Sequence, residues 1–218
     1  MLQILSCWYR GGVSNPGKTY SNTSSLSISP FPEEPLALSA QEGFGFFLGR
    51  PGLLLNKGRY EVLRKLGKGQ YSSTWLACDS QYVMLSTIHI VGIELIFSHC
   101  LRCSIRAEEK LRYCAIKILT VYATKGHHDH NLLELEIMQT ITSSFKTPYL
   151  PRLRDHFETE GPHGQHLCLV LPVLSDNVGN FRRSAPSKSL HPPKVKILIV
   201  QIVEALVGLH SANIIHTG

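Results

Sequence analysis

The sequence predicts an α+β fold, an antiparallel sheet that is interrupted by one helix and followed by further helices. Two strand-like runs at 59–69 and 71–80 flank a glycine-rich turn. A single amphipathic stretch with helical spacing follows at 126–141, and a long apolar helix is expected over Pro193–Ser211. Strands grouped ahead of the helices, rather than alternating with them, favour α+β over a parallel sheet.

Composition indicates a globular intracellular protein. Of the 218 residues 43% are hydrophobic and 17% are charged, which favours a buried core over a disordered chain. The net charge of +6 comes from basic residues scattered along the sequence, so we expect no direct nucleic-acid partner. The six cysteines lack disulfide spacing, so we expect reduced thiols and a location in cytoplasm and nucleus. The CxxC of Cys100 and Cys103 has no second ligand pair, so we predict no metal site.

Residues 1–51 are interpreted as a disordered or loosely docked tail. They are rich in Ser, Asn, Pro and Gly and bury too little apolar surface to offset the entropy of ordering. Within them, Phe44–Leu48 is the stretch that we expect to dock on a neighbour. The opening residues do not predict a signal peptide, because their apolar run is short and is broken by Arg10.

The later elements follow in order after this tail. A β-branched run predicts a strand within 108–121, and apolar residues at helical spacing predict the helix within 126–141, with Asp129 or Asn131 as its N-cap. Residues 149–174 predict a hairpin that turns at Gly161-Pro162-His163-Gly164. The preceding cluster, His127 to His130, is too tightly spaced for one tetrahedral metal site, and we interpret it as a solvated loop.

An apolar insert at about 82–106 separates the second strand from the third. It has the length of a membrane span, but Glu94, His89 and His99 lie within it, which disfavours a membrane partner. We interpret it as an aberrant insertion translated from a retained intron, and a true membrane anchor is the competing hypothesis.

Three short elements in a fixed order carry the chemistry. Gly67 and Gly69 form a glycine-rich turn that allows backbone N–H groups to approach phosphate oxygens, although a plain hairpin turn would also use two glycines. Ala115-Ile116-Lys117 places a lysine on a strand, with a small alanine on the same face. A carboxylate on the following helix would pair with this lysine and orient it. We predict Glu134 rather than Glu136, because apolar residues fall three, four and seven positions after Glu134.

In this order the elements resemble a eukaryotic protein kinase domain, and more narrowly the SR-protein kinases in their fungal form. The similar strings are RYEVLRKLGKGQYSSTWLACDS, RYCAIKIL, LPRLRDHFETEGPHGQHLCLVLPVLSDNV and GLHSANIIHT. The resemblance implies a kinase N-lobe at 58–174, apart from the insert, and the start of a C-lobe at 175–218. Ser72 in place of a third glycine is a feature of the family, and Thr74 in place of valine is a mild departure.

The resemblance also implies an ATP site and assigns its residues. Those covering the phosphates or lining the nucleotide would be Leu66, Gly67, Gly69, Ser72 and Thr74, with Lys117 holding the phosphates and Glu134 orienting it. Those framing the adenine would be Ala115, the gatekeeper Leu171, and the hinge residues Pro172 and Leu174. The Pro172 carbonyl would accept from the adenine amine, and the Leu174 N–H would donate to the ring.

The family reaction is ATP-dependent phosphorylation of serine in Arg/Ser-rich proteins, with Mg²⁺ in the complete domain. Where the family has the catalytic aspartate, this sequence reads His216, Thr217 and then Gly218, and the metal-binding DFG is not present. We therefore expect a truncated and inactive kinase domain without Mg²⁺ ligands. The alternative function is a catalytically dead nucleotide-binding or partner-binding fragment.

Overall fold

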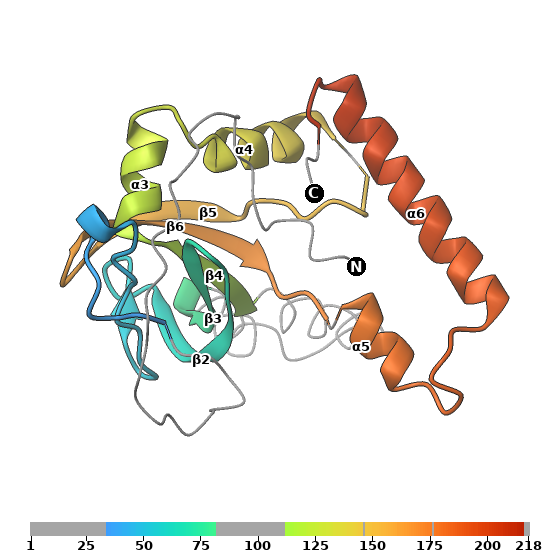
Figure 1. Ribbon diagram of the computed structural model, residues 1–218, viewed down its shortest axis with the longest axis horizontal. Coiled ribbons are helices and arrows are strands. Elements are labelled where there is room, and N and C mark those ends of the chain that lie inside the picture. The colour runs from blue at the N-terminus through green and yellow to red at the C-terminus, as the bar shows by residue number, and fades with distance from the viewer. Residues whose placement is uncertain (1–33, 82–111, 146, 176, 216–218) are drawn as a thin grey trace, which may run out of the picture.

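The computed structural model describes residues 34–81, 112–145, 147–175 and 177–215 (Figure 1). Several sequence predictions lie outside these residues: most of the expected tail, the insert at about 82–106 with Cys100 and Cys103, and the terminal His216, Thr217 and Gly218.

A six-stranded antiparallel sheet forms the body of the described chain, in the order β1-β2-β3-β4-β6-β5. Its strands are β1 (Leu54–Leu55), β2 (Tyr60–Lys68), β3 (Ser72–Asp79), β4 (Tyr113–Leu119), β5 (Asp155–Gly161) and β6 (Gly164–Pro172). The predicted hairpin is β5–β6, with Gly161 paired to Gly164 across the turn. Only β1 lacked a counterpart in the sequence prediction, since a two-residue strand carries no period.

Helices α3 (Val121–His128) and α4 (Glu134–Ser144) lie together along β5 and β6, whereas α5 (Val178–Arg183) and α6 (Pro192–Ser211) stand at the opposite end (Figure 1). The predicted helix at Pro193–Ser211 is therefore present almost residue for residue. The sequence did not predict α3. Its N-cap is Thr120, whose Oγ1 accepts from the Ala123 N–H at 3.2 Å.

The predicted N-cap of α4 is wrong. Asp129 is the C-cap of α3, and Asn131 donates its N–H to the Gly126 carbonyl in the turn that closes α3. Helix α4 begins after Leu133, which makes no side-chain cap hydrogen bond. The physical reason is that α3 uses the polar residues at its own C-terminus.

Two apolar clusters cover the two faces of the sheet. Cys114, Ile116 and Ile118 of β4 pack with Trp75 and Phe47 in one cluster. On β6 the alternate residues Leu167 and Leu169 join a second cluster with Leu135 of α4 and Ala123 of α3. Since successive strand residues point to opposite faces, the sheet is buried on both sides around β4 and β6.

The segment before β1 lies on the sheet. Phe46 and Phe47 are only 2% and 6% exposed, and the Gly45 and Phe44 carbonyls accept from the N–H groups of Val121 and Tyr122 at the start of α3. The Phe44–Leu48 stretch is thus docked on its own domain. A 3₁₀ turn at Ala40–Glu42 precedes it.

A third cluster joins α6 to the rest of the fold. Ala205 and Leu209 near the C-terminal end of α6 pack with Met138 and Ile141 of α4 and with Leu171 at the end of β6. Ala205 and Leu209 are the buried residues of this helix, and its N-terminal half projects away from the sheet (Figure 1). The described chain is therefore a sheet-and-helix lobe with the first helices of a second lobe attached.

Candidate nucleotide site

An ion pair between Lys117 and Glu134 lies at the centre of the candidate site. Lys117 comes from the middle of β4, and its Nζ is 2.5 Å from Oε1 of Glu134 in the first turn of α4. The two side chains are only 12% and 14% exposed, so the pair is screened less by water than a surface pair. Glu136 turns the other way, with its Oε1 3.5 Å from Nδ1 of His127. Of the two carboxylates weighed from the sequence, the structure places Glu134 beside the lysine.

The two glycines of the turn between β2 and β3 differ in the space around them. Gly69 donates its N–H to the Ser72 carbonyl at 2.8 Å, and a Cβ there would come 2.9 Å from the Ser72 Oγ. A Cβ added at Gly67 would meet no atom within 4 Å, and its φ is not in the left-handed region. Packing and conformation therefore do not demand glycine at 67, whereas a ligand that approaches the backbone would.

Strand register connects this turn to the ion pair. Thr74 is paired with Gly67 on β2 and with Lys117 on β4, so it lies between the turn and the lysine. Ser72 is buried and faces Leu119. Leu66 falls at an irregularity in the β2–β3 pairing and is 37% exposed, which leaves its apolar side chain available to a ligand.

The residues proposed to frame the adenine lie where the start of β4 pairs with the end of β6. Ala115 pairs with Leu171, and Cys114 pairs with Pro172, the last residue of β6. Leu171 is 7% exposed and packs into the cluster that joins α4 to α6. Leu174 lies just beyond the strand and is partly exposed. Burial raises the pKa of the Cys114 thiol to about 12, so this cysteine is a neutral core residue at physiological pH.

Sequence reasoning missed one residue that shapes the site. The Tyr71 carbonyl, at the tip of the glycine-rich turn, accepts from the Thr120 N–H at 2.9 Å. Its ring centroid lies 5.6 Å from that of Tyr122 on α3. Tyr71 therefore ties the turn to the end of β4. Its partners, Thr120 and Tyr122, are about fifty residues away in the sequence, so no local pattern could have indicated the contacts.

The residues at this site fit a nucleoside triphosphate better than they fit the Mg²⁺ ion that accompanies it in kinases. Open space over the Gly67 backbone, a largely buried lysine with a fixed carboxylate, and a small Ala115 beside that lysine suit phosphates and a flat ring. In the described ranges no group of three or more His, Cys, Asp or Glu side chains is placed to hold a metal ion.

None of the helices that the described residues form combines the length and the apolar character that a bilayer crossing requires. A hollow between α5 and α6 is lined by none of the candidate nucleotide residues.

The fold defines a protein kinase lobe. A crystal structure of a kinase domain superposes with a TM-score of 0.52 over 77% of this chain and 39% of its own chain, at 17% sequence identity. The fold class predicted from the sequence, a kinase-like N-lobe with the first helices of a C-lobe, is confirmed by this likeness.

Within that class the chain resembles the SR-protein kinases, as its motifs predicted. It is 27% identical to SRSF protein kinase 3 of Mus musculus over 179 residues, which are 79% of this chain and 26% of the relative. Against protein kinase dsk1 of Schizosaccharomyces pombe the identity is 29% over 164 residues, 73% of this chain and 25% of that protein.

The serine/threonine-protein kinase spk-1 of Caenorhabditis briggsae is 30% identical over 162 residues, 73% of this chain and 12% of its own length. The chain thus spans about a quarter or less of the length of these relatives. No family model matches the chain.

Proposed function

We propose that these residues form the ATP-binding part of a serine/threonine protein kinase of the SR-protein-kinase type. The observation that carries the proposal is the Lys117–Glu134 pair, fixed between β4 and α4 beside a glycine turn whose Gly67 backbone is open. A lysine held in this way positions the α- and β-phosphates of ATP, and the carboxylate keeps the ammonium in place. The bound nucleotide supplies the phosphoryl group.

Each remaining site residue has a role in this proposal. The main chain at Gly67 and Gly69 lies over the phosphates, and Leu66 and Ala115 enclose the adenine ring. The Pro172 carbonyl accepts from the adenine amine, and the Leu174 N–H donates to the ring. Leu171 limits the depth of the adenine pocket. Ser72 and Thr74 complete the strand that carries the turn.

Nucleotide binding tests this proposal directly. A fluorescent ATP analogue is titrated into the native chain and into Glu134→Gln, with Glu136→Gln as the matched control two residues away. Glu134→Gln should weaken binding by about tenfold or more, because the charge-assisted bond to Lys117 is lost. Glu136→Gln should bind like the native chain. Equal losses in both variants, or no binding by the native chain, would rule the proposal out.

The substrate and the activity form a finer part of the proposal. Relatives named as SR-protein kinases support serine in Arg/Ser-rich proteins as the acceptor. The 218 residues contain no catalytic-loop string of the form HxDxKxxN, so we propose that this polypeptide by itself binds ATP without transferring phosphate. Radiolabelled ATP and an Arg/Ser-repeat peptide test this. Transfer that is lost in Lys117→Ala would show that the polypeptide is an active kinase.

A further inference from the structure

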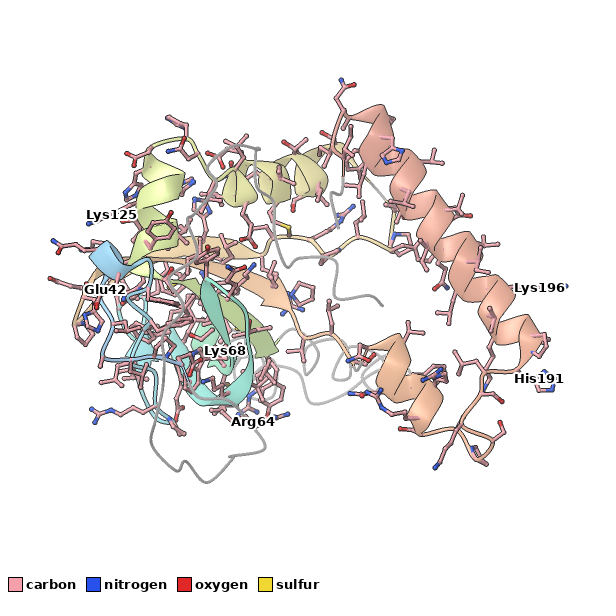
Figure 2. All side chains as sticks on the ribbon, viewed as in Figure 1. Glu42, Arg64, Lys68, Lys125, His191 and Lys196 are labelled. Atoms are coloured by element: carbon pink, nitrogen blue, oxygen red, sulfur yellow. The ribbon has the colours of Figure 1, made fainter. Side chains whose placement is uncertain are left out.

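The turn from α5 to α6 carries a concentration of positively charged side chains. Between Asn177 and Val203 the sequence has no aspartate or glutamate, yet it has five basic residues: Arg182, Arg183, Lys188, Lys194 and Lys196. Among the described residues none of the five pairs with a carboxylate. Figure 2 shows His191 and Lys196 at the outer end of α6, away from the sheet.

A hollow of about 390 Å³ opens within this charged region. Its apolar lining comes from Phe181, Ala185, Pro186 and Leu190, and its polar lining from three serine hydroxyls, His191 and Lys194. Phe181 is 47% exposed, and the Lys194 Nζ lies 5.8 Å from its ring centroid. An apolar hollow lined by one lysine, in a turn that carries further cations, is a surface for a ligand that is apolar at one point and anionic around it.

We propose that this hollow, with the cations around it, is a docking site for an acidic peptide segment of a partner protein. One apolar side chain of the peptide enters the hollow against Phe181 and Leu190. Its neighbouring carboxylates meet Arg182, Lys188 and Lys194. The charge complementarity decides the class of partner, because the cations have no carboxylate partner in the described fold and gain one on binding.

A nucleic acid fits this surface less well than a peptide. Nucleic-acid sites follow a line of phosphates with a basic groove and stacking aromatic side chains. Among the described residues that line the hollow, the aromatic rings are Phe181 and the His191 imidazole, and both lie at a compact pocket rather than along a track.

Fluorescence anisotropy with a labelled peptide tests the proposal. The probe has one leucine flanked by glutamates, and a matched probe carries glutamines instead. The native chain should bind the glutamate probe at least about tenfold more tightly, with affinity falling as salt rises. The double variant Arg182→Glu/Lys194→Glu should lose about tenfold or more, and Phe181→Ala should also bind more weakly.

Lys125→Glu on α3 is the control, an exposed charge reversal far from α5 and α6 (Figure 2). It should bind the probe like the native chain, and ATP should not displace the probe, which separates this site from the nucleotide site. Thermal unfolding checks that the double variant is folded. Equal binding of the two probes, or an unchanged affinity in the folded double variant, would overturn the proposal. Tighter binding of a single-stranded oligonucleotide that displaces the probe would also overturn it.

Discussion

Glu134 and Glu136 lie in the same first turn of α4, and only Glu134 reaches Lys117. Helix residues that are two positions apart in the sequence are about 200° apart around the axis, so the two carboxylates point in nearly opposite directions. The sequence could select Glu134 because the buried Met138 and Ile141 follow it at four and seven positions. Helical periodicity was enough here, since the lysine and the carboxylate both come from regular elements.

His166 is a second residue whose surroundings decide its chemistry. It is fully buried on β6, and its Nδ1 lies 2.8 Å from the Leu119 carbonyl, to which it donates. Its Nε2 has no hydrogen-bond partner among the described residues, and the ring packs edge-on against Phe47. Burial lowers the pKa of His166, with the hydrogen bond to Leu119 opposing this and the charge of His163 adding to it. The folded protein therefore favours the neutral imidazole.

The free energy of unfolding should therefore decrease at acidic pH, because His166 is protonated more readily in the unfolded chain. The unfolded chain takes up its proton near pH 6.5, whereas the folded chain takes it up only at lower pH, so unfolding gains protons in between. Each pH unit in that window should remove up to about 1.4 kcal/mol of unfolding free energy, and the contribution is complete above pH 6.5. Thermal unfolding at pH 7.5 and 5.5 measures it.

His166→Gln should flatten this pH dependence, while His156→Gln, an exposed residue on β5, should keep it. An equally steep acid loss in His166→Gln would show that another group is responsible.

At the scale of the elements, one arginine connects strands that lie toward opposite edges of the sheet. Arg59 immediately precedes β2, and its guanidinium donates to both Asp79 oxygens, at 3.1 and 2.9 Å, on β3. It also donates to Asp155 Oδ2 on the edge strand β5 at 2.9 Å. The Tyr60 hydroxyl donates to the same Asp155 oxygen at 2.8 Å, and the Tyr60 ring stacks on Phe157. The sheet is therefore curled, with β2 and β5 in contact although three strands separate them.

Arg59→Ala should lower the free energy of unfolding by about 2–3 kcal/mol, because the Asp79 carboxylate, only 5% exposed, loses its charged partner. Arg59→Lys should recover only part of this loss, since an ammonium cannot form the two-pronged contact. Urea denaturation provides the measurement. Arg64→Ala, an exposed arginine on β2, should change stability by less than about 0.5 kcal/mol. A similar loss in both alanine variants would count against the role of Arg59.

The strands were more predictable than the helix α3. Alternation and the Gly161–Gly164 turn are local signals, and β5 and β6 follow them. The stretch Val121–Thr124 is rich in β-branched residues, so its local preference is for a strand. The helix forms because Thr120 caps it and because Val121 and Ala123 are buried against the sheet and the 34–51 segment. Tertiary contacts override propensity there, and no short window of sequence contains them.

At the scale of the whole molecule, α6 presents an exposed apolar face in the described part of the chain. Five of its aliphatic side chains are more than half exposed: Ile197, Ile199, Val200, Val203 and Val207. They lie on one helix and form a patch of the kind that drives association in water.

The polypeptide should therefore self-associate at high concentration. Val203→Lys/Val207→Lys should shift it toward monomer in light scattering, whereas Leu54→Lys, an exposed leucine on β1, should not. A native chain that stays monomeric across the concentration range would contradict this.

The proposed docking hollow could not be predicted from the sequence, although the arrangement of the candidate nucleotide residues could. The nucleotide residues follow one another as turn, strand and helix, so their linear order already indicates their arrangement. The basic residues between Arg182 and Lys196 looked scattered along the chain. The reversal of direction between α5 and α6 brings them to one place, and only a three-dimensional structure shows this. The docking of Phe46 and Phe47 was similarly dependent on a distant surface.

The spacing of β3 and β4 has a consequence for the order of folding. These strands are neighbours in the sheet, yet β3 ends at Asp79 and β4 begins at Tyr113. Loop-closure entropy grows only with the logarithm of length, so this separation costs about 2 kcal/mol more than a tight turn. The hairpin β5–β6 closes through a two-residue turn and should form in microseconds. The pairing of β3 with β4 should form later. During synthesis the N-terminal strands would thus wait, with one edge unpaired, for their partner.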